Sequence, residues 1–259
     1  MTLRQAVAKS VNTVAVQMSE IYGRGNVIAI ARSLGVTSPI ESVPSLALGA
    51  YETTLMEMVA AYGHLASEGL GVQPYGITKI TNKKGDVLYE RKDQVPPRII
   101  SKQVVAKAND LFSAVINAGT GVRARIGRPA AGKTGTTSDY KDAWFIGYTP
   151  DLVTGVWVGN DAAISMKKVT GSNLPAAIWR GFMTKALAGK KVRALPIAKA
   201  KHSDTQLPWG SGWQVDSEGS EESGVGGRHL PWGTKNRGRR PAPAHNQEET
   251  KNFWEDLGL

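Results

Sequence analysis

The sequence predicts an α+β domain in which helices pack on an antiparallel sheet. Patterns typical of helices precede and follow a group of short strand-like segments, and these segments adjoin one another in the chain. Strands that are joined by short turns pair as antiparallel neighbours. Hydrophobic residues make up 41% of the 259 residues, which is enough to form a core.

The first expected elements are two helices. Ser10 or Asn12 is a suitable N-cap for a helix that reaches about Ile21, because apolar residues then recur on one face at helical spacing. A second, shorter helix is expected over residues 26–34, where Gly35 ends it.

A third helix and a hairpin follow. Thr54 and Glu57 have the spacing of a capping box, which predicts a helix from there to about Ser67. Residues 75–81 and 87–91 flank the turn-forming residues 82–86, and this arrangement predicts a β-hairpin.

The longest helix and the sheet come next. Residues 102–117 place their apolar side chains on one stripe, and Gly119 ends the helix that this stripe predicts. Strands are expected over residues 133–137, 143–148 and 153–159. Pro175 begins a final helix that reaches about Leu187.

The chain divides into a folded part at residues 1–189 and a low-complexity tail at residues 190–259. The tail is rich in glycine, proline and serine and poor in large aliphatic residues. Such a composition buries too little apolar surface to offset the entropy of ordering, so we expect the tail to be disordered.

Composition excludes several classes of site. The sequence has no cysteine, and its four histidines are scattered with no pair at i,i+4, so we expect no disulfide, no metal and no cofactor. No apolar run approaches the roughly 18 residues of a membrane span, and residues 1–18 alternate polar and apolar side chains, so we expect no export signal in this chain. The net charge of +10 favours anionic ligands, but no nucleic-acid partner is expected.

One motif has two interpretations. Residues 127–134 fit the phosphate-binding pattern G-x-x-x-x-G-K-[ST] of nucleotide hydrolases. That site needs a buried parallel strand before the glycines and a helix that starts at Lys133. Arg123 and Arg125 precede the motif instead, and strand-like residues follow it, so the context does not fit.

The other interpretation is the Lys-Thr-Gly motif of penicillin-binding proteins and serine β-lactamases, at Lys133-Thr134-Gly135. It lies on a strand at the edge of the active site. Lys133 would then supply a fixed positive charge for a substrate carboxylate, which the hydroxyls of Thr134 and Thr136 would also bind. Gly135 would allow close approach, and the N–H of Thr136 would donate to the developing oxyanion.

The rest of the chain supports the second interpretation. Nearly all of residues 2–188 resembles the transpeptidase domain of class A, bifunctional penicillin-binding proteins, and one of the resembling passages is residues 132–150 (GKTGTTSDYKDAWFIGYTP). The other resembling passages are residues 2–16, 46–50, 54–62, 156–161 and 178–183. The resemblance implies the α+β fold of penicillin-binding proteins and serine β-lactamases.

Ser10-Val11-Asn12 matches the Ser-x-Asn motif of this family. By the resemblance, Ser10 relays a proton near the leaving amine, and Asn12 hydrogen-bonds the substrate and the catalytic lysine. Without the resemblance, both residues are ordinary helix caps.

The nucleophile of the family is the serine of a Ser-x-x-Lys motif that precedes Ser-x-Asn. The two matches here, at Ser138-Asp-Tyr-Lys141 and Ser165-Met-Lys-Lys168, both follow Lys133 and are in the wrong order. We therefore expect an N-terminal part of the domain to be missing, with the remaining core partly exposed. We also expect this chain alone to form no covalent penicillin adduct.

The leading functional hypothesis is a D,D-transpeptidase region that cross-links peptidoglycan stem peptides ending in acyl-D-Ala-D-Ala, inactive as this fragment. By the resemblance, it also binds β-lactams and works on the outer face of the cytoplasmic membrane. The alternatives are a non-catalytic module that binds stem peptides or a partner protein and, more remotely, a nucleotide hydrolase that uses residues 127–134.

Overall fold

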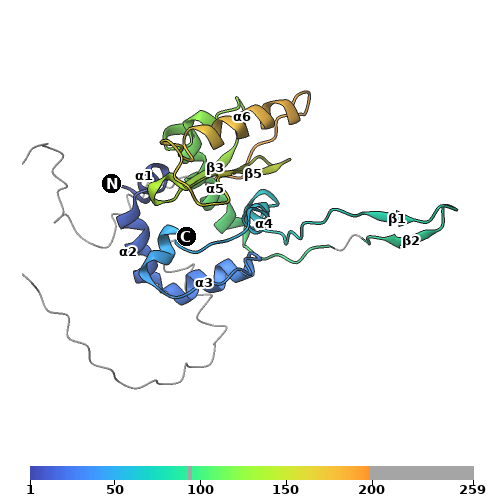
Figure 1. The fold of residues 1–259 in the computed structure, drawn as a ribbon, viewed down its shortest axis with the longest axis horizontal. Coiled ribbons are helices and arrows are strands. Elements are labelled where there is room, and N and C mark those ends of the chain that lie inside the picture. The colour runs from blue at the N-terminus through green and yellow to red at the C-terminus, as the bar shows by residue number, and fades with distance from the viewer. Residues whose placement is uncertain (93–94, 199–259) are drawn as a thin grey trace, which may run out of the picture.

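The computed structural model describes residues 1–92 and 95–198 (Figure 1). Most helices come before the strands of the central sheet, and one helix follows them. In order they are α1 (Leu3–Lys9), α2 (Asn12–Tyr22), α3 (Arg24–Ser33), η1 (Pro44–Leu48), α4 (Leu55–Ala66), β1 (Lys79–Thr81), β2 (Val87–Glu90), α5 (Lys102–Ala118), η2 (Val122–Ala124), β3 (Ala131–Thr136), η3 (Ser138–Tyr140), β4 (Asp142–Tyr148), β5 (Val153–Gly159) and α6 (Leu174–Ala186).

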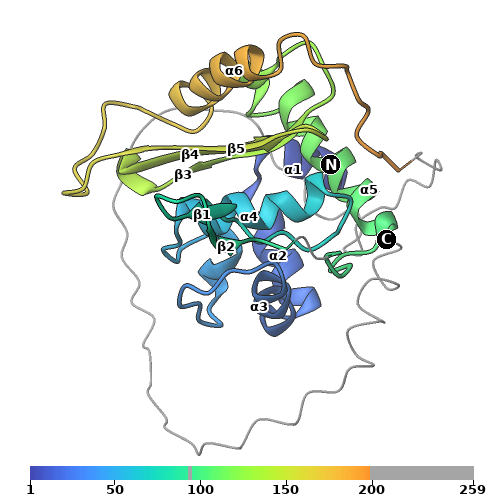
Figure 2. The same cartoon turned by 90° about the vertical axis from the view of Figure 1, so that its right-hand side faces the viewer.

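A three-stranded antiparallel sheet forms the centre of the fold, in the order β3-β4-β5. Lys133 lies opposite Ile146, and Asp142 lies opposite Gly159. Figure 2 shows α6 on one face of this sheet and α2, α4 and α5 on the other. The predicted α+β class is therefore confirmed, because short turns join strands that follow each other in the chain.

Each face of the sheet buries its own cluster of side chains. On the α6 side, Trp179 and Phe145 are fully buried and their rings meet edge to face with centroids 5.3 Å apart. On the other side, Tyr148 packs with Tyr62 of α4 and Phe112 of α5. Phe145 and Tyr148 are three residues apart on β4, so they point to opposite faces.

The N-terminal helices differ from the expectation. The first helix, α1, already spans Leu3–Lys9, and Ser10 follows its last turn instead of starting α2. Val11 takes the N-cap position of α2 without a side-chain hydrogen bond. The structure thus corrects the expected capping role of Ser10: Thr2 and Gln5 form a capping box for α1, which the sequence analysis missed.

The other helices agree closely with the prediction. α3 begins at Arg24, two residues before the expected start. The capping box at Thr54 and Glu57 is present at the start of α4. α5 begins after Ser101, whose hydroxyl accepts from the N–H of Val104, and α6 begins one residue before Pro175.

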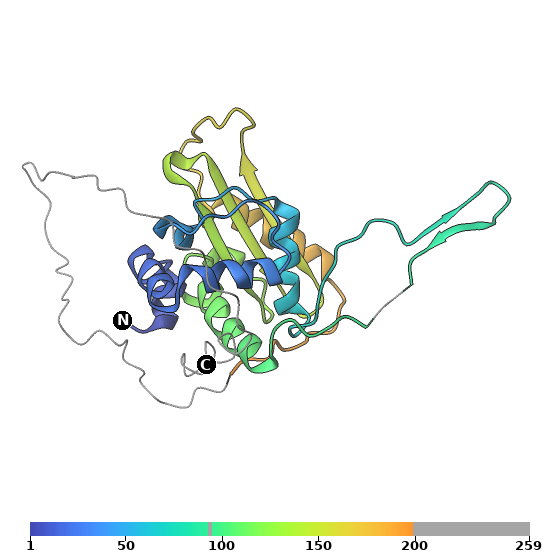
Figure 3. The same cartoon turned by 90° about the horizontal axis from the view of Figure 1, so that it is seen from below.

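The predicted hairpin forms a separate two-stranded sheet of β1 and β2. Figure 3 shows it projecting away from the helices and the central sheet. All of its strand residues are exposed, although Ile80 and Tyr89 face each other across the strands.

The folded part continues past Gly189. Leu195 is buried against Ala131 and Tyr148, and the N–H of Ala198 donates to the carbonyl of Ala106 on α5. The rest of the expected tail, residues 199–259, lies outside the described residues.

Candidate active site

The Lys-Thr-Gly motif lies on β3, at one edge of the central sheet. β3 pairs with β4, and its outer edge takes no strand from the described residues. Lys133 sits in the middle of this strand, which continues to Thr136 before a 3-10 turn begins at Ser138. The nucleotide-hydrolase alternative is wrong for this motif, because no helix starts at Lys133 and the strand is antiparallel.

Lys133 is the central charge of the site. Its Nζ donates to the hydroxyl of Ser10 at 2.8 Å and to the carbonyl of Thr134 at 3.0 Å. No carboxylate in the described part of the chain forms an ion pair with it. Burial of the ammonium lowers the pKa of Lys133 to about 8, because desolvation disfavours the charged form. Since no carboxylate of the described residues neutralises the Lys133 ammonium, its charge is available to an anionic ligand.

Ser10 is placed by the way in which α1 ends. Its φ is 55°, in the left-handed region, and the N–H groups of Ser10 and Val11 donate to the carbonyls of Val7 and Ala6. These two bonds form the Schellman motif that commonly ends a helix. α2 begins two residues later, so Ser10 occupies a sharp corner between two helices, where its side chain reaches Lys133.

Asn12 makes no hydrogen bond with Lys133, whose partners are Ser10 and Thr134. It is the first residue of α2 and its side chain is exposed, without a hydrogen bond to another described residue. The structure thus brings Ser10 and Lys133 together across 123 residues of chain, whereas Asn12, two residues after Ser10, stays exposed at the surface.

The two threonines of the motif have partners that the sequence analysis missed. The Thr134 and Thr120 hydroxyl oxygens lie 2.7 Å apart. Thr136 accepts a hydrogen bond from the N–H of Gly171 at 3.0 Å, and its own O–H proton stays free for a ligand. The feature of the sequence that could have pointed to Thr120 is its position between two glycines, Gly119 and Gly121.

Gly135 has less room than expected on one side. A Cβ built on it would lie 3.2 Å from Cβ of Trp144, its cross-strand neighbour. A side chain at this position would require Trp144 to shift by a few tenths of an ångström, so the sheet as well as any ligand favours a small residue here.

The two serines of the Ser-x-x-Lys pattern lie away from this contact. Ser138 begins the turn after β3, and Ser165 donates to the carbonyl of Asp139 from the loop between β5 and α6. Neither hydroxyl is hydrogen-bonded to Lys133, whose partners are Ser10 and Thr134.

Other kinds of site find little support in the described residues. They contain no group of three His, Asp or Glu side chains that could hold a metal ion. They also contain no helix that is both long enough and apolar enough to cross a membrane.

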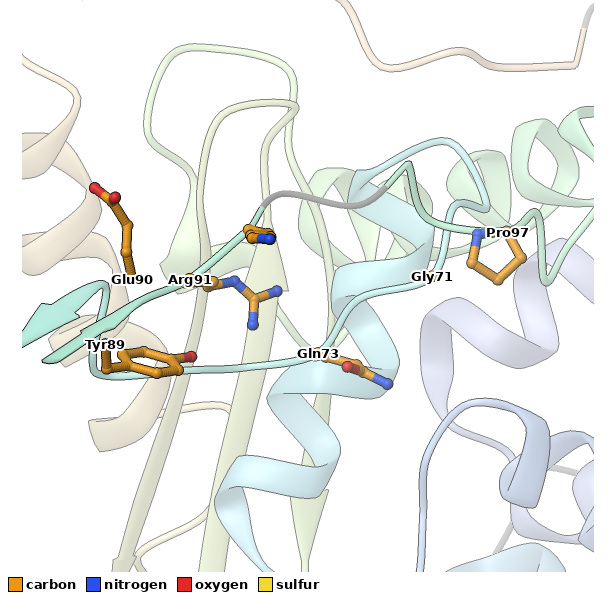
Figure 4. Close-up of a pocket in the computed structure, with 7 residues that line it drawn as sticks. Gly71, Gln73, Tyr89, Glu90, Arg91 and Pro97 are labelled. Atoms are coloured by element: carbon orange, nitrogen blue, oxygen red, sulfur yellow. The ribbon is translucent and has the colours of Figure 1, made fainter. Parts of the chain in front are cut away.

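A hollow of about 370 Å³ lies at the base of the β1–β2 hairpin (Figure 4). Its polar lining includes Gln73, Glu90, Arg91 and Lys92, and Figure 4 shows that the side chains of Gln73, Glu90 and Arg91 do not converge on one point. The guanidinium of Arg91 is instead stacked on Tyr75, 3.8 Å from the ring centroid. This hollow shares no residue with the contact between Ser10 and Lys133.

Comparison with known proteins gives one consistent result. Residues 1–178 match the family model described as the penicillin binding protein transpeptidase domain. The chain is 39% identical over 184 residues to penicillin-binding protein 1A of Aquifex aeolicus, which covers 70% of this chain and 25% of that protein. It is 33% identical over 251 residues to penicillin-binding protein 2D of Bacillus subtilis, which covers 93% of this chain and 34% of that protein.

A solved structure agrees. The fold matches that of PonA1 from Mycobacterium tuberculosis in complex with penicillin V, with a TM-score of 0.67 and 27% identity. The match covers 76% of this chain and 59% of that structure. The chain spans about a quarter to a third of the length of the two curated relatives.

Proposed function

This chain belongs to the family of class A penicillin-binding protein transpeptidase domains, and on that premise we propose that it acts as a D,D-transpeptidase region in cell-wall synthesis. Its substrate would be a peptidoglycan stem peptide that ends in acyl-D-Ala-D-Ala. β-Lactams would bind at the same site, and the similar PonA1 structure is a complex with penicillin V. The domain would act in the cell envelope, at the outer face of the cytoplasmic membrane.

The 2.8 Å hydrogen bond between Lys133 and Ser10 at the open edge of β3 is the observation that carries this proposal. An ammonium without a carboxylate partner attracts the terminal carboxylate of the peptide. The hydroxyls of Thr134 and Thr136 lie on the same strand and would add hydrogen bonds to that carboxylate. The N–H of Thr136 would donate to the oxyanion of the acyl group under attack.

Ser10 would serve as a proton relay. Its hydroxyl accepts from the Lys133 ammonium, so its own proton is free to go to the amine of the leaving D-Ala. We do not assign Ser10 the role of the acylated serine, because in this family that serine belongs to Ser-x-x-Lys. Asn12, on the first turn of α2, would hydrogen-bond the peptide backbone of the substrate.

Reversible binding of a stem-peptide analogue to the full chain tests the proposal. Diacetyl-Lys-D-Ala-D-Ala should bind saturably, and Lys133→Met should weaken binding at least about tenfold, because one charge-assisted hydrogen bond contributes roughly 1.5–3 kcal/mol. Lys141→Met is the matched control, since Lys141 is an exposed lysine of the same region. It should leave the affinity unchanged.

Three outcomes bear on the proposed function. Equal binding by the wild type and Lys133→Met would overturn the proposal. Saturable, Lys133-dependent binding without turnover, even in the presence of an acceptor amine, is the expected result for a transpeptidase region that is inactive as this fragment, and it also fits a non-catalytic binding module. Turnover to a cross-linked peptide would contradict both the non-catalytic module and the expectation that this chain alone is inactive.

A further inference from the structure

Thr120 joins two parts of the site that lie far apart in the sequence. It stands in the turn that follows α5, and its N–H donates to the carbonyl of Ala8 on α1 at 3.0 Å. Its hydroxyl oxygen lies 2.7 Å from that of Thr134 on β3. One residue thus contacts both α1, the helix that Ser10 follows, and β3, the strand that carries Lys133.

The backbone of α1 at Ala8 packs directly against the backbone of this turn at Gly119. A Cβ built on Gly119 would lie 2.1 Å from the carbonyl oxygen of Ala8, so no side chain fits there. Gly121 donates its N–H to the carbonyl of Val115, which folds the turn back on the last turn of α5. The glycines on both sides of Thr120 therefore fix its position against α1.

The contacts close a ring. Ser10 bonds Lys133, Thr134 follows Lys133 in the strand, Thr134 meets Thr120, and the N–H of Thr120 holds Ala8, two residues before Ser10. A closed ring of hydrogen bonds fixes the distance between any two members better than one bond alone. The contact of Thr120 with Thr134 therefore supports the contact of Ser10 with Lys133.

The same contact links the direction of the Thr134 proton to that of the Thr120 proton. Each hydroxyl has one proton, and either oxygen is able to donate in the 2.7 Å contact. If Thr134 donates to a ligand carboxylate, its oxygen must accept from Thr120. Thr120 then serves as the donor that keeps the proton of Thr134 directed outward.

We propose that Thr120 is a positioning residue of this site, which holds Ser10 against Lys133 and directs the hydroxyl of Thr134 toward a carboxylate ligand. The second half of this statement rests on the proposed function, whereas the first half depends on the ring of contacts alone.

Two substitutions in the full chain separate these roles from simple structural support. Thr120→Val keeps the shape and the backbone N–H but removes the hydroxyl, and Thr120→Ser keeps the hydroxyl. The control is Thr154→Val, which removes a half-buried threonine hydroxyl that contacts the sulfur of Met183, away from the ring. The thermal melt of each variant reports whether the fold is intact.

The first measurement is the titration of Lys133, followed by NMR of lysine side chains labelled with ¹³C at Cε. Thr120→Val removes the contact with Thr134 and should loosen α1 relative to β3. Water would then reach the Lys133 ammonium and raise the pKa of Lys133 by about half a unit or more. Thr120→Ser and Thr154→Val should leave the pKa unchanged. An unchanged titration in Thr120→Val, or an equal shift in Thr154→Val, would overturn the positioning of Ser10 and Lys133.

The second measurement compares diacetyl-Lys-D-Ala-D-Ala with its C-terminal amide. Thr120→Val should reduce the preference for the carboxylate about fivefold, the usual effect of one hydrogen bond, and Thr120→Ser should restore it. An unchanged preference in Thr120→Val would refute the direction of Thr134. If the wild type binds neither peptide, both the proposed function and the proposed direction of the Thr134 hydroxyl are wrong. The titration of Lys133 still tests whether Thr120 holds Ser10 against Lys133.

Discussion

Lys133 combines two properties that oppose each other at the scale of the single residue. It is partly withdrawn from water, which lowers its pKa to about 8, and it lacks a carboxylate partner among residues 1–92 and 95–198. The hydroxyl of Ser10 and the carbonyl of Thr134 compensate only part of the lost hydration. An anionic ligand would complete the compensation, so binding and protonation of Lys133 are linked.

This linkage predicts how affinity depends on pH. With a pKa of about 8 in the free protein, Lys133 is charged at pH 7 and mostly neutral at pH 9. The affinity for an acyl-D-Ala-D-Ala carboxylate should fall about tenfold between these values, because the bound anion requires the proton. Calorimetric titration of diacetyl-Lys-D-Ala-D-Ala at several pH values measures it, and a flat profile would contradict it. Lys133→Met, which cannot ionise, should show no such dependence.

Stability follows the same titration with a defined sign. The ordinary pKa of 10.5 applies to the unfolded chain, so the unfolded state binds more protons than the folded state between about pH 8 and 10.5. The contribution of Lys133 to stability therefore rises with pH over this window. Below pH 8 the group opposes folding, as is common where a site is built for a ligand.

At the scale of the element, Glu57 shows how a local motif becomes a tertiary contact. It completes the capping box with Thr54 at the start of α4. Its carboxylate also accepts from the N–H and hydroxyl groups of Thr37 and Ser38, at 2.6–2.8 Å, and so fastens the chain after α3 to α4. These hydrogen bonds, those from Ser38 and Thr37 foremost, hold the pKa of Glu57 far below its usual range.

We expect Glu57→Gln to lower the free energy of unfolding by about 2 kcal/mol at pH 7, because an amide group cannot accept all of these bonds. The depressed pKa stabilises the fold above the ordinary value of 4.5 and loses this effect as the pH falls below it. The difference between variant and wild type should therefore shrink from pH 5 to pH 3 in urea melts. Glu52→Gln, at an exposed position nearby, is the control, and a difference independent of pH would refute the role of the charge.

The hairpin of β1 and β2 is the opposite case, an element that depends on its own sequence. Lys79 and Glu90 form a cross-strand ion pair at 3.2 Å, Ile80 lies opposite Tyr89, and Asn82 accepts two backbone N–H groups in the turn. Its strands are exposed throughout, so the elements of the central sheet add little to it. This independence is why the hairpin was predictable from its residues alone.

At the scale of the whole molecule, the sheet divides the core into two clusters, and α6 covers one of them. Trp179 is the largest fully buried side chain, and its indole N–H donates to the carbonyls of Gly147 and Thr154 on neighbouring strands. A Cβ on Gly147 would lie 2.9 Å from this indole, so the strand and the ring fit without spare room. Trp179 therefore ties α6 to both β4 and β5.

Trp179→Ala should destabilise the fold by about 3–5 kcal/mol, because it opens a large cavity and leaves two carbonyls without their donor. A thermal melt should show a decrease in Tm of about 10 °C. Phe182→Ala on the same helix is the matched control, since Phe182 is 51% exposed, whereas Trp179 is 0% exposed. Its effect should stay within about 0.5 kcal/mol, and equal effects of the two substitutions would contradict the assignment of the core.

The sequence by itself determined most of the elements, α1 excepted, because helix caps, strand alternation and turns depend on hydrogen bonds between residues close in the chain. It also identified the Lys-Thr-Gly motif and, by resemblance, the family. The tertiary structure decided that Lys133 reaches Ser10, that burial lowers the pKa of Lys133, and that Thr120 connects the two sides of the site. These properties depend on how closely α1, α5 and β3 pack. That packing joins residues more than a hundred positions apart, which no local pattern encodes.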